Sequence, residues 1–141
     1  MTPEEARERF AAARVADLAT VTPAGTPHIV PIVFALIDDT VYSVVDEKPK
    51  RTTDLKRLEN VRANPRAALL ADHYEEDWTQ LWWVRADGSA RVIDPDEPEA
   101  RRSLAALTER YPQQRPIGPV LAVDVDRWTG WLGGSADAAS G

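Results

Sequence analysis

The spacing of apolar and polar residues along the chain predicts a mainly β protein. Short apolar segments bounded by turn sequences are typical of strands, and in the last of them Leu121, Val123 and Val125 recur at every second position. This pattern predicts strands over residues 15–21, 27–36, 41–45, 67–71, 81–93 (with a kink near Asp87-Gly88) and 120–128. Turn sequences at 23–26 and 38–39 join the first three strands, so we expect these three to form antiparallel hairpins.

Three segments instead show the spacing of helices, and they are predicted over about 3–13, 51–61 and 95–111. Thr2 and Pro3 are a typical N-cap and first position for the first of them. The residues expected to face the interior are Ala6, Phe10 and Ala13, then Leu55, Leu58 and Val61, then Leu104 and Leu107. Residues 112–119 are predicted to be a loop.

These elements predict one domain over residues 1–132, of the α+β class and mainly β. Six antiparallel strands in so short a chain favour a closed or partly closed barrel, because closure removes unpaired strand edges. A sandwich of two sheets is the alternative. Residues 133–141, which read GGSADAASG, are predicted to be a disordered tail.

Composition narrows the classes of function. A net charge of -6 argues against nucleic-acid binding, which needs surplus positive charge. The chain has no cysteine, so disulfides, thiolate nucleophiles and cysteine zinc sites are excluded. Its two histidines, His28 and His73, lack metal-ligand spacing, and we expect no metal. No apolar run approaches the roughly 20 residues of a membrane span, so we expect a cytoplasmic protein that does not bind membranes.

Positive charge is concentrated in one segment of this acidic chain. Seven of the 17 Lys and Arg residues lie between positions 48 and 66. Cations, hydroxyls and free N–H groups at a helix N-terminus hold a phosphate without a metal. The residues in that position are Lys48, Lys50, Arg51, Thr52 and Thr53. The segment therefore predicts a phosphate-binding site, and the alternative is a solvated helix face that carries basic residues.

The order of these motifs resembles a known family. LATVTPAGTPHIVPIVFALIDDTVYSVVD is followed by the basic turn and helix, by NPRAALLAD, and by a tryptophan-containing strand that ends in GSARVI. From about Glu4 to Trp131 this order is similar to the pyridoxamine 5'-phosphate oxidase-like split β-barrel family, in particular to its actinobacterial branch of probable enzymes of the deazaflavin coenzyme F420. The resemblance implies a six-stranded antiparallel split barrel that pairs as a homodimer, with two flavin-type cofactor sites at the subunit interface.

The resemblance also implies which residues hold the cofactor. Its phosphate would contact Lys48, Lys50, Arg51, Thr52 and Thr53, with Arg57 one helical turn beyond. Its ring system would lie near Val44 and Val45 and face the backbone amides of Pro31, Ile32 and Val33. The turn Lys48-Pro49-Lys50 is longer than the basic motif of better-known relatives, so which cation meets the phosphate stays open by a few positions.

The tryptophans are candidates for a wall of the pocket. Adjacent Trp82 and Trp83 must face opposite sides of a strand, so one faces the core or a dimer contact while the other is available to a cofactor. We take Trp83 as the pocket residue. For any one of these tryptophans, burial in the core is the alternative.

The residues show no convincing acid–base or nucleophile set, and no catalytic residue is named. Hydride transfer is consistent with this, because the cofactor carries the reactive atom and the protein orients it. The first hypothesis is an F420-dependent oxidoreductase that passes hydride to a small unsaturated or conjugated acceptor. The alternatives are an FMN-dependent, pyridoxamine 5'-phosphate oxidase-like oxidoreductase and a flavin or deazaflavin carrier without turnover.

Overall fold

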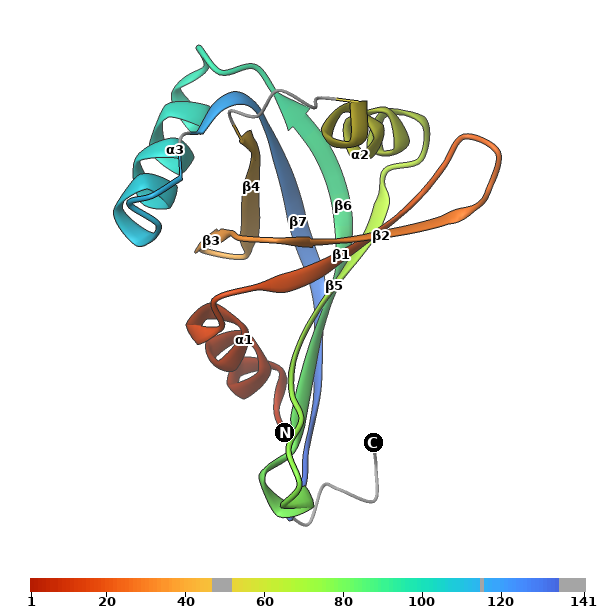
Figure 1. The fold of residues 1–141 in the computed structure, drawn as a ribbon, viewed down its shortest axis with the longest axis vertical. Coiled ribbons are helices and arrows are strands. Elements are labelled where there is room, and N and C mark those ends of the chain that lie inside the picture. The colour runs from red at the N-terminus through yellow and green to blue at the C-terminus, as the bar shows by residue number, and fades with distance from the viewer. Residues whose placement is uncertain (47–51, 115, 135–141) are drawn as a thin grey trace.

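The computed structural model describes residues 1–46, 52–114 and 116–134 (Figure 1). In chain order its elements are α1 (Pro3–Ala12), β1 (Ala16–Val21), β2 (Pro27–Ile32), β3 (Ala35–Ile37), β4 (Thr40–Asp46), α2 (Thr52–Ala63), β5 (Arg66–His73), a 3-10 helix (Trp78–Gln80), β6 (Trp82–Ile93), α3 (Pro98–Arg110) and β7 (Pro116–Leu132). The three predicted helices are therefore present, each within a few residues of its expected ends.

The strands form one antiparallel sheet in the order β2-β1-β5-β6-β7-β4-β3. Figure 1 shows β5, β6 and β7 running together along the length of the molecule, with the β1–β2 hairpin crossing them. Three helices on a strongly bent antiparallel sheet confirm the predicted α+β class. The described residues contain seven strands rather than the expected six, because one predicted strand is divided.

The predicted strand 27–36 is broken between Ile32 and Ala35, which separates β2 from β3. These two strands lie at opposite edges of the sheet, so the expected three-stranded meander is wrong, although the β1–β2 and β3–β4 hairpins form as predicted. The physical reason is that the two halves pair with different strands. Ile32 at the end of β2 pairs with Ala16 of β1, whereas Ala35 at the start of β3 pairs with Tyr42 of β4. Residues 33 and 34 carry the chain between the two edges of the bent sheet, and Phe34 is fully buried there.

The last strand begins earlier than predicted. Residues 112–119 were expected to form a loop, but β7 starts at Pro116, where it pairs with Asp46 of β4. Proline and glycine in the segment argue against a central strand. A change of register between Val44 and Asp46 accompanies this pairing, and such irregular positions are where a strand tolerates proline.

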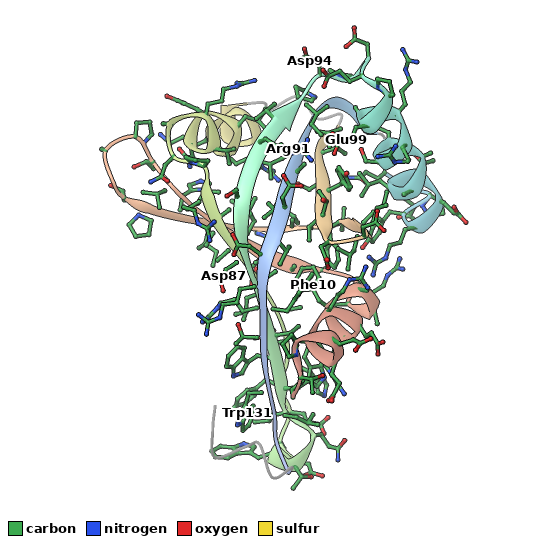
Figure 2. All side chains as sticks on the ribbon, turned by 180° about the vertical axis from the view of Figure 1, so that it is seen from behind. Phe10, Asp87, Arg91, Asp94, Glu99 and Trp131 are labelled. Atoms are coloured by element: carbon green, nitrogen blue, oxygen red, sulfur yellow. The ribbon has the colours of Figure 1, made fainter. Side chains whose placement is uncertain are left out.

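The predicted kink at Asp87-Gly88 is confirmed as a β-bulge. Asp87 pairs with Arg127 and Gly88 with Val125, so Asp126 is an extra residue on β7. A bulge increases the local twist of the pair. It lies midway along the two longest paired strands, where Figure 2 labels Asp87.

Two clusters of buried side chains form the interior. The first joins α1 and α2 to the central strands, and the second joins α3 to β3, β4 and β7. The predicted inward residues Ala6, Phe10, Leu58, Val61 and Leu107 are buried. Ala13 and Leu104 are partly buried against the same clusters, and the side chain of Leu55 lies outside the described part.

An ion-pair network fastens α3 to the sheet. In Figure 2, Arg91 of β6 and Glu99 of α3 point toward one another. Arg91 donates to both carboxylate oxygens of Glu99 at 2.8 and 2.7 Å, and to Asp124 of β7 at 2.7 and 3.0 Å. The Tyr42 hydroxyl donates to Glu99 at 2.7 Å. Because Glu99 lies at the start of α3, the network sets where that helix rests on the sheet.

This network makes part of the stability pH-dependent. The Arg91 guanidinium, with a smaller contribution from the Tyr42 hydroxyl, lowers the pKa of Glu99 from its ordinary 4.5 to about 2. A carboxylate with a lowered folded-state pKa stabilises the fold above its unfolded value, and that stability is lost as the pH falls through the window from about 4.5 to about 2. We expect Glu99→Gln to cost about 1 kcal/mol at pH 7, since the pair is partly exposed.

Thermal unfolding from pH 7 to pH 2 measures this effect. The difference in Tm between Glu99→Gln and the unchanged protein should shrink across that acidic window. Glu97→Gln is the matched control, because Glu97 is exposed and makes no side-chain capping bond at the same helix start. A Tm difference that stays constant with pH would show that the Glu99 carboxylate is not linked to folding.

The predicted tail begins with ordered residues. The Gly133 N–H donates to the Leu81 carbonyl at 2.8 Å, so residues 133 and 134 continue the folded domain. Residues 135–141 lie outside the described part. Among the described residues, no helix has both the length and the apolar character needed to cross a membrane.

Candidate functional site

A cavity of about 770 Å³ lies in the described part of the protein. It lies where the end of β2, the middle of β4 and helix α2 approach the segment that follows α3. The residues that line it are Arg14, Val15, Pro31, Ile32, Val33, Ser43, Val44, Arg57, Tyr111, Pro112, Gln113 and Gln114. The sheet order separates β2 and β4 by four strands, so bending of the sheet brings them to one cavity.

Five of the predicted cofactor residues line this cavity: Pro31, Ile32, Val33, Val44 and Arg57. They come from β2, the residue that follows it, β4 and α2, which are separate in sequence. Proline has no backbone N–H, so in the predicted backbone contact with a ring only the other two residues of the β2 segment can donate. Pro31 can offer its carbonyl.

The remaining predicted residues fall elsewhere. Trp83 lies on β6, opposite Asp72 and Trp131, and the Arg85 guanidinium lies 5.8 Å from its ring centroid. Trp83 is not among the cavity's lining residues. Lys48, Lys50 and Arg51 lie outside the described residues. Of Val45, Thr52 and Thr53 only the backbone is described, in β4 and at the start of α2.

Several lining residues were not anticipated. Arg14 and Val15 join α1 to β1, and residues 111–114 follow α3. The sequence did contain a signal that Ser43 could be a site residue. Its small hydroxyl side chain lies at an inward position of a strand, between a tyrosine and a valine. Arg14, Tyr111 and Gln114 carried none, since each lies in a short connection whose position depends on the packing of other elements.

The lining contains two buried side-chain oxygens that lack a hydrogen-bond partner within the described part of the chain. The Ser43 Oγ and the Gln114 Oε1 are buried, and neither finds a hydrogen-bond partner among the described residues. Ser43 is only 3% exposed. A buried polar atom without a partner costs roughly 1–3 kcal/mol, so native proteins rarely leave one unused. A bound molecule that supplies the missing hydrogen bonds would remove this cost.

One side of the cavity is held by a small network of arginines. The Arg14 guanidinium lies 4.7 Å from the Tyr111 ring centroid and donates to the Arg110 carbonyl at 3.1 Å. The Tyr111 hydroxyl donates to the Arg14 carbonyl at 2.9 Å. Arg110 donates in turn to the carbonyls of Phe34, at 3.0 Å, and Ala13. These bonds hold residue 111 and the link between α1 and β1 in contact.

The charge of the cavity favours an anion. Its described lining includes two arginines, Arg14 and Arg57, and no carboxylate. Burial lowers the pKa of the neighbouring Arg110, and the positive charge of Arg14 lowers it further. No group of three or more His, Cys, Asp or Glu residues suited to a metal occurs in the described part of the chain.

The sequence from residue 2 to residue 132 matches the pyridoxamine 5'-phosphate oxidase family. The chain belongs to this family. The match covers both segments that contribute strands to the cavity, and it agrees with the split-barrel architecture. No curated protein matches the chain.

Solved structures share the fold. A conserved hypothetical protein from Mycobacterium tuberculosis superposes with a TM-score of 0.73 at 23% identity, over 94% of this chain and 85% of that one. An FAD-binding protein from Mesorhizobium loti gives 0.71 at 21%, over 92% and 94%. A heme binding protein from Mycobacterium smegmatis gives 0.71 at 23%, over 93% of this chain and 54% of its own. At these identities the likeness establishes the fold alone.

Proposed function

We propose that the cavity binds a flavin-type cofactor and that the protein is an F420-dependent oxidoreductase. The observation that carries the proposal is that Arg57 and residues 31–33, at the end of β2 and just beyond it, line one anion-favouring cavity. The family membership and the similarity to proteins named for FAD and heme binding support a cofactor-binding role.

The cavity fits such a group in size and chemistry. A volume of about 770 Å³ falls within the roughly 300–1,000 Å³ of ligand pockets. Arg57 would hold a phosphate or acidic tail together with Lys48, Lys50 and Arg51, which belong to the segment 47–51 outside the described residues. The backbone N–H groups of residues 32 and 33 would meet polar atoms of the ring, and Ser43 would supply a hydroxyl at the cavity wall.

When bound, a deazaflavin would supply hydride chemistry to a small unsaturated or conjugated acceptor. The protein's own part would be to bind and orient the two molecules and to limit the access of water. Arg57 would bind the anionic end, the apolar side chains of Ile32 and Val44 would lie against the ring system, and residues 111–114 would limit access from solvent. The proton that the acceptor takes up with the hydride is assigned to no side chain. By family resemblance we propose that two copies pair as a homodimer with the cofactor near the interface.

The second candidate is a carrier that binds a flavin, deazaflavin or heme without turnover. The relatives named as FAD-binding and heme binding proteins favour it. An FMN-dependent, pyridoxamine 5'-phosphate oxidase-like reaction is a third outcome. Titration of the purified protein with FMN, FAD, the deazaflavin and heme, followed by oxidation of the reduced deazaflavin against a panel of acceptors, separates them. Tight deazaflavin binding with turnover supports the proposal, and tight binding without turnover supports the carrier.

Arg57→Ala should weaken binding of the phosphate-bearing cofactor by about 1–3 kcal/mol, the scale of a charge-assisted hydrogen bond. Lys50→Ala and Arg51→Ala should each have an effect of similar size. Arg62→Ala is the matched control, because Arg62 is an exposed arginine on the same helix and does not line the cavity. Fluorescence titration gives each Kd. Equal affinities for Arg57→Ala and Arg62→Ala would remove Arg57 from the site.

A further inference from the structure

We propose that Arg14 and Ser43 bind a carboxylate and that Gln114 accepts a hydrogen bond from a donor elsewhere on the same ligand, so that the acceptor of the proposed reaction is a small unsaturated acid. The inference rests on the proposed function and names its substrate class. All three residues line the same cavity as the proposed cofactor residues. They come from the α1–β1 link, from β4 and from the segment after α3.

Arg14 is held ready to bind an anion. Its guanidinium is stacked on Tyr111 with 4.7 Å to the ring centroid, and one of its N–H groups donates to the Arg110 carbonyl at 3.1 Å. Guanidinium carries five N–H donors, so several stay available for a carboxylate, which it binds in a planar, two-pronged geometry. Because the side chain is already fixed, little conformational freedom is lost on binding.

The charge of Arg14 is not neutralised within the described part of the protein. Arg7, Arg66, Arg85 and Arg91 each pair with a carboxylate at 2.7–3.1 Å. Arg14 contacts a backbone carbonyl and an aromatic ring instead. Arg110 adds a second positive charge beside it, and repulsion between the two contributes to the lowered pKa of Arg110. An anion bound here would relieve that repulsion.

Ser43 and Gln114 give the subsite its polar complement. The Ser43 hydroxyl, without a partner among the described residues, can donate to a carboxylate or carbonyl oxygen. The Gln114 Oε1, also without one, can accept from an O–H or N–H of the same ligand. The combination suits an acid that carries a hydrogen-bond donor at some distance from its carboxylate.

The test compares an acid with its neutral amide on the full-length protein without cofactor. The probes are 4-hydroxycinnamate and 4-hydroxycinnamamide, which differ in charge and little in shape, and calorimetry gives both Kd values. We expect the acid to bind at least about tenfold more tightly, the scale of one charge-assisted contact. Arg14→Met should reduce the ratio to about twofold or less. Arg101→Met, an exposed arginine on α3 outside the cavity, should leave it unchanged.

A second variant keeps the test decisive if Arg14→Met does not fold. Gln114→Glu adds a negative charge to the cavity that holds the acid, so it should weaken binding of the acid by about tenfold and leave the neutral amide bound no more weakly. Equal binding of acid and amide by the unchanged protein, or binding of neither, would overturn the carboxylate subsite.

Deazaflavin titration of the same variants separates the two proposals. One outcome is that Arg14→Met weakens binding of the deazaflavin as strongly as it weakens binding of the acid. In that case Arg14 belongs to the site that binds the anionic end of the cofactor, so the inference fails while the proposed function stands. If the unchanged protein prefers the acid but binds no flavin, deazaflavin or heme, the proposed function fails and the carboxylate subsite stands.

Discussion

Phe10→Ala should lower the free energy of unfolding by about 3–5 kcal/mol, the cost of deleting a fully buried aromatic ring. Phe10 is 0% exposed and is labelled in Figure 2 on α1, facing the sheet. Its ring centroid lies 4.6 Å from that of Phe34 and 5.4 Å from that of Trp128. The cavity left behind cannot close easily, because its walls belong to three separate elements. Denaturant unfolding measures the change.

Phe10→Leu is the control, since it keeps most of the buried volume, and it should cost less than half as much. The effect of Phe10→Ala should also reach the site, because the Phe34 carbonyl accepts from Arg110, which lies beside Arg14 and Tyr111. A loss of less than about 1 kcal/mol for Phe10→Ala would show that the α1 core contributes little to stability, against the usual cost of such a deletion.

Gly88→Ala should destabilise the protein at the upper end of about 1–3 kcal/mol, the range for overpacking. Gly88 lies at the bulge where β6 and β7 change register. A Cβ there would overlap the Asp124 carbonyl oxygen and would lie 2.9 Å from the carbonyl carbon of Asp124 and 3.0 Å from the Val125 Cα. These are backbone atoms of the paired strand, so relief requires the two strands to separate.

The matched substitution is Ser89→Ala, one residue along the same strand. Ser89 is exposed and loses only the hydroxyl that accepts from Arg66 at 3.1 Å. Thermal unfolding of the two variants should therefore show a far larger fall in Tm for Gly88→Ala. Similar values for both would mean that the bulge adjusts without cost.

Part of the site could be predicted from the amino-acid sequence. Ile32, Val33, Val44 and Arg57 were expected from the order of motifs, and all four line one cavity. The location of Trp83 could not be predicted from the sequence in the same way. Alternating side chains of a strand point to its two faces, but the sequence does not indicate which face meets a ligand. Trp83 pairs with Trp131 across β6 and β7, away from that cavity's lining.

The unexpected lining residues depended on long-range packing. Arg14 reaches the cavity because α1 packs beneath the sheet, and the segment that contains Gln114 reaches it because Arg110 and Tyr111, at the end of α3, bond to backbone carbonyls of residues 13, 14 and 34. Neither position has a local pattern of its own. The break between β2 and β3 had the same origin, since an unbroken apolar run does not say that its two halves pair with different strands.

The sequence by itself determined the helices, most of the strands, the buried faces of the helices, the hairpin turns and a kink near Gly88, because each of these is set by side chains within a few residues of one another. The tertiary structure alone decided the order of the strands, the division of β2 from β3 and the set of side chains around the cavity. Those features depend on pairings between residues far apart in the chain, and the bending of the sheet that joins β2 to β4 leaves no periodic signal in either strand.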